Sequence, residues 1–191
     1  MNIGLYFGSF NPIHNGHLII ANYILQNTDL DKVWFVVTPH NPHKQTNSLL
    51  QENNRLHLVR LAIEGEPNLK ASNIEFSLPK PNYTIDTLTY LQEKYDKYQF
   101  TVIMGSDSYT NIKNWKNYEA ILANYKVLIY ERPEFILNPT QLHNNSTIIK
   151  APLLAIASTQ IRKMVKLKQS IRYWVPTEVQ EEIRACNYYT K

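Results

Sequence analysis

Short apolar runs that alternate with stretches of helical periodicity limit the folds open to this chain more than any other feature. Between the runs, apolar residues recur at helical spacing, for example at Leu56, Val59 and Ile63. A strand that is apolar at every position is buried on both faces, as in a parallel sheet covered by helices. The pattern predicts an α/β fold with a doubly wound, mainly parallel sheet and helices on both faces. The strands are expected at residues 3–7, 33–37, 100–104 and 127–130, with a shorter fifth run at 147–149.

The stretch 8–17, Gly-Ser-Phe-Asn-Pro-Ile-His-Asn-Gly-His, joins the first expected strand to an apolar helical stretch at 18–25. Such a strand-to-helix turn lies at the carboxyl edge of a parallel sheet, where ligands bind. Free N–H groups at the start of a helix suit an anion, and Gly8 lets the backbone approach a phosphate closely. If the helix begins near Asn15, His14 and His17 lie on the same side of it. We therefore expect a phosphate site at this turn.

The two histidines of the turn have three interpretations: metal ligands, structural residues or donors to phosphate. Two histidines three positions apart do not form a zinc site without a third ligand, and the chain has one cysteine and no His-Glu-x-x-His arrangement. No metal-ligating residue is therefore expected. The five glycines, at 4, 8, 16, 65 and 105, also exclude the G-x-G-x-x-G fingerprint and a P-loop, so a phosphate site must be built in another way.

Length and composition are those of one globular domain over residues 1–191. The chain has 20 Lys and Arg against 16 Asp and Glu, a net charge of +4, which suits a polyanionic ligand but does not indicate nucleic acid. The single cysteine, Cys186, excludes an internal disulfide and suits a reducing compartment. No apolar run approaches the ~20 residues of a membrane helix, and no signal peptide is visible. We expect a cytoplasmic protein with no nucleic-acid or membrane partner.

A second candidate phosphate motif, Ser158-Thr159-Gln160-Ile161-Arg162, precedes a helical stripe that contains Met164 and Val165. Ser158 or Thr159 would cap this helix, whose free N–H groups and dipole favour a phosphate. On these residues alone, an ordinary N-cap followed by a surface arginine is the simpler interpretation. The segment from about 156 to 191 is expected to be helical and to carry this motif within the same domain.

The His-x-Gly-His signature at 14–17, taken together with 158–162, resembles the nucleotidyltransferases that carry this signature. Further segments resemble, in order, the motifs of the bacterial nicotinate mononucleotide adenylyltransferases. These segments are Pro42-His43-Lys44, Tyr83-Thr84-Ile85-Asp86-Thr87, Gly105-Ser106-Asp107, Trp115 and Arg132-Pro133. The resemblance covers nearly the whole chain. It implies a Rossmann-like fold and the transfer of AMP from ATP to nicotinate mononucleotide, which gives nicotinate adenine dinucleotide and pyrophosphate.

The resemblance also implies roles for individual residues. Charge stabilisation during the transfer is assigned to His14, His17, Lys44 and Arg162. ATP binding is assigned to Gly8, Ser9, Phe10, His14, Gly16, His17, Gly105, Ser158, Thr159 and Arg162. Acceptor binding is assigned to Phe10, His43, Lys44, Thr84, Asp107, Trp115 and Arg132. Ala157 stands where the family usually has a serine, which puts one hydroxyl contact in doubt.

Further expectations concern the acceptor and the metal. Thr84 is expected to cap a helix, and Lys113, Lys116 or backbone amides around 108–111 are the candidate donors to the ring carboxylate of nicotinate. Magnesium is expected to arrive with ATP, because the sequence shows no carboxylate cluster to hold it. The partners are thus ATP and nicotinate mononucleotide, and a homo-oligomer is compatible with this assignment.

Two other functions remain open. The first and last motifs also resemble pantetheine-phosphate adenylyltransferase, although Trp115 and the segment 83–87 argue against it. The chain could instead be a catalytically inactive nucleotide-binding module. Intact His14, His17 and Arg162 argue against that alternative.

Overall fold

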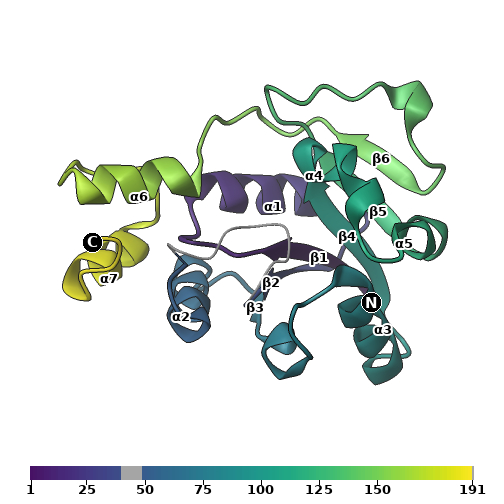
Figure 1. The fold of residues 1–191 in the computed structure, drawn as a ribbon, viewed down its shortest axis with the longest axis horizontal. Coiled ribbons are helices and arrows are strands. Elements are labelled where there is room, and N and C mark those ends of the chain that lie inside the picture. Colours follow the sequence, from purple (N-terminus) through teal and green to yellow (C-terminus); the bar gives the residue numbers. More distant parts are fainter. Residues whose placement is uncertain (40–48, 191) are drawn as a thin grey trace.

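The computed structural model describes residues 1–39 and 49–190, and within them six strands form one parallel sheet (Figure 1). The order of the strands is β3-β2-β1-β4-β5-β6. Their bounds are β1 (Asn2–Gly8), β2 (Lys32–Val37), β3 (Leu69–Ser72), β4 (Gln99–Gly105), β5 (Lys126–Tyr130) and β6 (Ser146–Ile149). The direction of winding reverses between β1 and β4, which is the topological switch point where ligands bind in such sheets. The predicted Rossmann-like α/β fold is confirmed.

Four of the expected runs lie in β1, β2, β4 and β5, and the shorter run at 147–149 lies in β6. Strand β3, Leu-Lys-Ala-Ser, was not predicted, because its side chains do not form an apolar run. Within the described residues it lies at the edge of the sheet and pairs with β2 alone, so it needs less apolar surface than a central strand.

The helices cover both faces of the sheet, as Figure 1 shows for α1 above the strands and α3 below them. The helix after the first turn begins at Asn15, as expected, and the stripes at 56–63, 85–95, 161–165 and 179–186 all lie in or at the ends of helices. A helix start was expected around 108–111, whereas α4 begins at Ser106, and α5 was not expected; both helices are too short to show a period. The bounds are α1 (Asn15–Asn27), α2 (Glu52–Ala62), α3 (Thr84–Lys94), α4 (Ser106–Thr110), α5 (Tyr118–Asn124), α6 (Ser158–Lys166) and α7 (Thr177–Ala185), with 3-10 turns η1 (Ile74–Ser77), η2 (Ile112–Asn114) and η3 (Pro139–Gln141).

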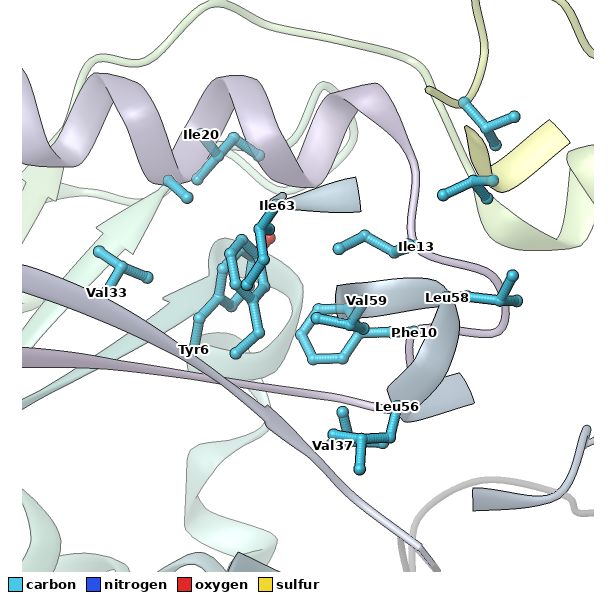
Figure 2. Close-up of a cluster of buried hydrophobic side chains, with 14 of the residues drawn as sticks. Tyr6, Phe10, Ile13, Ile20, Val33, Val37, Leu56, Leu58, Val59 and Ile63 are labelled. Atoms are coloured by element: carbon cyan, nitrogen blue, oxygen red, sulfur yellow. The ribbon is translucent and has the colours of Figure 1, made fainter. Parts of the chain in front are cut away.

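Two apolar clusters lie on the two faces of the sheet. Successive side chains of a strand point to opposite faces, so Trp34 and Val36 join one cluster while Val33, Phe35 and Val37 join the other. Figure 2 shows part of the latter cluster, in which Ile20 points from α1 toward the strands. Complete burial of one such side chain stabilises the folded protein by about 1.5–3 kcal/mol. The two clusters therefore hold the strands, and with them the strand ends, in fixed positions.

The C-terminal helices belong to the cluster that contains Phe35. Ile161 of α6 and Val179 and Ile183 of α7 are buried in it, together with residues of α1 and α2. This packing brings α6 beside the turn between β1 and α1, although the two are far apart in the sequence. In Figure 1, α6 and α7 lie at the left, away from the N-terminus.

Candidate active site

A cavity of about 350 Å³ opens at the carboxyl ends of β1, β4 and β5, at the switch point of the sheet. It is bounded by the β1–α1 turn, the start of α6, the start of α3 and the segment that follows β5. Most of the residues singled out from the sequence line it. These are Gly8, Ser9, Phe10, His14, His17, Thr84, Gly105, Asp107, Trp115, Arg132, Ser158, Thr159 and Arg162.

Three of the expected residues, Gly16, His43 and Lys44, are not in this set. Gly16 is buried and is not part of the cavity lining, and an added Cβ there would lie 3.1 Å from Nδ1 of His14. His43 and Lys44 lie outside the described residues.

The two histidines form a stacked pair at the start of α1. His14 is the N-cap residue, and its N–H donates to Nδ1 of His17 at 3.3 Å. The two rings are stacked, with centroids 3.7 Å apart. Because Nδ1 of His17 accepts a hydrogen bond, a neutral His17 carries its proton on Nε2, which is then a donor. The ring of Phe10 packs edge-on against His17 and restricts its movement.

His14 is buried, and this burial controls its charge. Loss of hydration, and secondarily the positive charge of Arg132, lowers the pKa of His14 to about 4. The ring is therefore neutral at pH 7 and can donate one hydrogen bond without bringing a positive charge. Nδ1 of His14 is buried beside Gly16 and has no hydrogen-bond partner among the described residues, whereas His14 as a residue contributes to the cavity lining. A bound anion is the kind of group that such a ring could contact.

Helix α6 is held against the β1–α1 turn by two side chains of the second motif. Ser158 Oγ donates to the carbonyl of Pro12 at 2.9 Å, and Arg162 Nη1 donates to the carbonyl of Asn11 at 2.8 Å. The expectation that Ser158 or Thr159 caps the helix is wrong, because the N-cap residue is Ala157 and no side chain caps it. In the described part of the chain the first N–H groups of α6 therefore donate to no capping side chain, and Ser158 and Thr159 at this end of the helix line the cavity.

Asp107, Arg132 and Tyr130 form a polar group at the ends of β4 and β5. Arg132 Nε lies 3.1 Å from Oδ1 of Asp107, and Arg132 Nη2 donates to the hydroxyl of Tyr130 at 3.2 Å. Gly105 leaves room for this ion pair, since an added Cβ would lie 2.9 Å from Arg132 Nε and still closer to the Asp107 carboxylate. Both members of the pair remain partly exposed to the cavity.

The expected acceptor side of the cavity is formed by residues around the start of α3. Thr84 is the first residue of α3, and Tyr83 is the N-cap, so the expectation that Thr84 caps the helix is wrong. Trp115 is half-buried at the cavity. Lys116 also lines it, but its ammonium lies 2.9 Å from Oδ2 of Asp86. This pairing weakens the case for Lys116 as the reader of a ring carboxylate. Lys113 is exposed and is not part of the cavity lining.

Sequence reasoning missed Arg55, a fully buried arginine of α2. Its Nη1 donates to the carbonyls of Ser9, at 2.5 Å, and Thr38, at 2.9 Å. Its Nε and Nη2 donate to the carbonyls of Leu50 and Pro39. The guanidinium thereby joins the loops that follow β1 and β2. The available signal was a charged residue four positions before Val59, on the apolar stripe of a helix.

Sequence reasoning also missed Glu75, a buried glutamate of η1 that belongs to the cavity lining. Thr87 Oγ1 donates to its Oε1 at 2.8 Å, and Asn82 Nδ2 donates to its backbone carbonyl at 2.9 Å. Burial raises the pKa of Glu75 to about 7, although hydrogen bonds from Thr87 and Thr38 oppose the rise. The stretch around Glu75 shows no period, so no sequence pattern could have indicated it.

Among the described residues, no group of three or more His, Cys, Asp or Glu side chains is arranged to hold a metal ion. In the same residues, no helix is long and apolar enough to cross a membrane.

The sequence and the fold were compared with those of known proteins. Residues 5–164 match the model of the family described as cytidylyltransferase-like. A probable nicotinate-nucleotide adenylyltransferase of Flavobacterium psychrophilum is 52% identical, with 100% of each chain covered. One of Cytophaga hutchinsonii, with the same description, is 50% identical over 100% of this chain and 99% of the relative.

Solved structures agree with the fold. The nicotinic acid mononucleotide adenylyltransferase of Plasmodium falciparum, in complex with NaAD, superposes with a TM-score of 0.86 at 23% identity and covers 98% of this chain and 97% of that one. At this identity the likeness supports the fold alone. The family follows from the sequence matches over most or all of the chain: the protein belongs to the cytidylyltransferase-like family and, within it, to the nicotinate-nucleotide adenylyltransferases.

Proposed function

We propose that this protein transfers AMP from ATP to nicotinate mononucleotide, giving nicotinate adenine dinucleotide and pyrophosphate. The observation that carries the proposal is one cavity that joins two phosphate motifs to an aromatic acceptor side. His14 and His17 line the cavity from the β1–α1 turn, and Arg162 lines it from α6. Trp115, which follows η2, belongs to its acceptor side. Relatives of about 50% identity that bear the same description support this choice of reaction.

The reaction needs positioning and charge stabilisation more than proton transfer. An oxygen of the acceptor phosphate attacks the α-phosphorus of ATP, a P–O bond forms, and the bond to the bridging oxygen of the β-phosphate breaks. The acceptor phosphate is largely a dianion at pH 7, because its second pKa is about 6, so no general base is required. Negative charge grows on the departing pyrophosphate and around the α-phosphorus.

The chain offers several donors for this charge. Nε2 of His17, the neutral ring of His14, the first N–H groups of α6 and the guanidinium of Arg162 are grouped at the cavity. Donors that are held in place before the reaction stabilise the transition state without reorganisation. We infer that these groups bind the triphosphate. Lys44 keeps the role expected from its motif, as a proposal only.

ATP would enter as its magnesium complex. The described residues contain no carboxylate cluster for a dedicated ion, and the carboxylate of Asp107 is engaged by Arg132. Magnesium commonly binds through substrate phosphates with few protein ligands, so the donor set fits a substrate complex. Asp107 would then accept from ribose hydroxyls with its remaining oxygen.

The ring of the acceptor would stack on Trp115, with Thr84 at its edge. Trp115 is half-buried and belongs to the cavity lining, and an indole is well suited to stack on an aromatic ring. We further propose that residues 1–191 act as one unit, since α6 and α7 share a buried cluster with β1 and α1. The exposed thiol of Cys186 suits the cytoplasm as its location.

The test is pyrophosphate release from ATP, measured with nicotinate mononucleotide, nicotinamide mononucleotide, phosphopantetheine and no acceptor in parallel. Release that depends on nicotinate mononucleotide supports the proposal. A preference for phosphopantetheine would favour the first alternative, and no release with any acceptor would favour an inactive nucleotide-binding module.

His17→Ala tests the assignment of the catalytic donor. It should lower kcat by about 10²–10³ with little change in KM for ATP, because a donor is lost where charge develops. His143→Ala removes a histidine outside the cavity lining and is the matched control. A near-normal kcat for His17→Ala would show that the assignment is wrong.

A further inference from the structure

A buried polar cluster lies beneath the acceptor side of the cavity and has no part in the reaction described so far. Its members come from three elements: Thr38 follows β2, Glu75 is on η1, and Thr87 is on α3, with Asn82 just before that helix. Glu75 is 1% exposed, Thr87 is fully buried, and Thr38 and Asn82 are each 6% exposed. Glu75, Asn82 and Thr38 all contribute to the cavity lining.

The cluster has more acceptors than donors. Oε1 of Glu75 accepts from Thr87 at 2.8 Å, but Oε2 of Glu75 and Oδ1 of Asn82 are both buried and have no partner among the described residues. An ionised carboxylate can only accept, whereas a protonated one also donates. A proton on Glu75 therefore supplies a donor where two unpaired acceptors would otherwise lie close to the cavity. Burial and the unpaired acceptors favour the neutral form of Glu75, whereas the hydrogen bonds from Thr87 and Thr38 favour its ionised form.

Several cations on neighbouring elements have contacts of their own away from Glu75. The guanidinium of Arg55 on α2 donates to backbone carbonyls, including that of Thr38. Lys80 forms an ion pair with Glu52 of α2 at 3.0 Å. Lys70 of β3 lies over the ring of Trp34, 4.1 Å from its centroid.

The remaining neighbours are on α3 and beside it. Asp86 pairs with Lys116 at 2.9 Å, and the ammonium of Lys116 also lies over the ring of Tyr83. None of these cations forms an ion pair with Glu75 in the described part of the chain. Burial is thus the largest influence on Glu75 and raises its pKa to about 7, with Thr87 and Thr38 acting in the opposite direction. The carboxyl changes charge within the physiological range.

Resting on the proposed function, we propose that Glu75 sets the preference for a pyridinium ring that bears a carboxylate over one that bears a carboxamide. The neutral form of Glu75 places no like charge beside the ring carboxylate of nicotinate. The two mononucleotides differ only in a carboxylate against a carboxamide. Thr87 holds Glu75 one helical turn below Thr84, at the side of the cavity where the ring is proposed to bind. An ionised Glu75 would repel the carboxylate of nicotinate and would leave the uncharged carboxamide much less affected.

The size of the effect follows from the coupling of two like charges. In a site of low dielectric, a neighbouring like charge commonly moves a pKa by one unit or more, and one unit is a tenfold change in an equilibrium constant. The nicotinate carboxylate stays ionised above pH 6. The ratio of kcat/KM for nicotinate over nicotinamide mononucleotide should therefore fall by about tenfold as Glu75 ionises.

The experiment measures this ratio in the wild-type protein from pH 6 to pH 8.5. Both acceptors carry the same ribose phosphate and react with the same ATP, so the ratio cancels titrations that affect both. Glu75→Gln keeps the size of the side chain and is neutral at every pH, so its ratio should be constant and at least as high as the wild-type value at pH 6. Glu93→Gln makes the same change at an exposed position of α3 and should behave as wild type.

A second measurement needs no variant. Calorimetry in buffers of different ionisation enthalpy counts the protons taken up on binding, and at pH 7.5 the wild-type protein should take up more protons with nicotinate mononucleotide than with nicotinamide mononucleotide. A wild-type ratio that does not change with pH, equal proton uptake, or a Glu75→Gln ratio with the wild-type slope would overturn the proposal. Those outcomes leave the proposed function intact, whereas a failure of both acceptors to react would refute the function itself.

Discussion

His14 shows how the environment of one residue can link the site to the stability of the fold. Its pKa is lowered to about 4 in the folded protein, whereas an unfolded histidine has a pKa of about 6.5. Between these two pH values the unfolded chain binds more protons than the folded protein does. The contribution of His14 to the free energy of unfolding is therefore complete above pH 6.5 and is lost as the pH falls toward 4.

Replacement of His14 by Asn should remove that part of the pH dependence. The wild-type free energy of unfolding should decline with acid by up to about 1.4 kcal/mol per pH unit more steeply than that of His14→Asn. Urea denaturation of both proteins from pH 7 to pH 4.5 measures the difference, with His57→Asn as a control at an exposed position. Parallel curves for wild type and His14→Asn would contradict the assigned shift. Glu75 is present in all three proteins and acts in the opposite direction, since its stabilisation is lost as the pH rises through 7.

Residues could be predicted from the sequence where a local pattern places them. His14 and His17 follow a strand and begin a helix, so their position at the cavity follows from the pattern alone. Lys116 could not be judged in this way, because its partner Asp86 is thirty residues away. Glu75 was missed because its pKa depends on burial by three elements, and burial of a polar residue leaves no period in the sequence.

At the scale of elements, α2 acts on the site through Arg55. Four backbone carbonyls surround its guanidinium: those of Ser9 after β1, Thr38 and Pro39 after β2, and Leu50, two positions before α2. The charge has no carboxylate partner among the described residues to which it is hydrogen-bonded, so these carbonyls replace its hydration. The side chain therefore fixes the backbone on which Ser9 reaches the cavity.

Arg55→Met should destabilise the protein by about 3 kcal/mol or more, since it leaves several buried carbonyls without a donor. It should also raise KM for ATP, because the loop after β1 loses its support. Unfolding by urea and steady-state kinetics give the two quantities. Arg60→Met changes an exposed arginine of the same helix and should alter neither. Wild-type stability for Arg55→Met would show that the carbonyls find other donors.

The elements themselves were predictable in proportion to their length and burial. Central strands and long helices showed clear patterns, whereas the edge strand β3 and the short helices α4 and α5 did not. The contact of α6 with the β1–α1 turn joins residues 146 positions apart, from Ser158 to Pro12, and no local pattern encodes such a distance. Only the resemblance to known motifs indicated that the two stretches meet.

At the scale of the whole molecule, the described residues of the cavity proposed to bind both substrates offer no ready-made metal site. Activity should therefore disappear with EDTA and return with magnesium, while the purified protein carries no stoichiometric transition metal. Pyrophosphate release and elemental analysis measure the two properties. One tightly bound zinc ion per chain would contradict this prediction.

The junction of α6 with the β1–α1 turn also bears on how the protein is made. A ribosome completes β1 and its turn at the outset, whereas Ser158 and Arg162 emerge only after all six strands. The strands can pair into a sheet while the chain is still being synthesised. A triphosphate that bound at that stage would contact only half of the proposed donor groups, because those of α6 would still be absent. A nascent chain is therefore expected to stay inactive toward ATP until nearly all of its residues have left the ribosome.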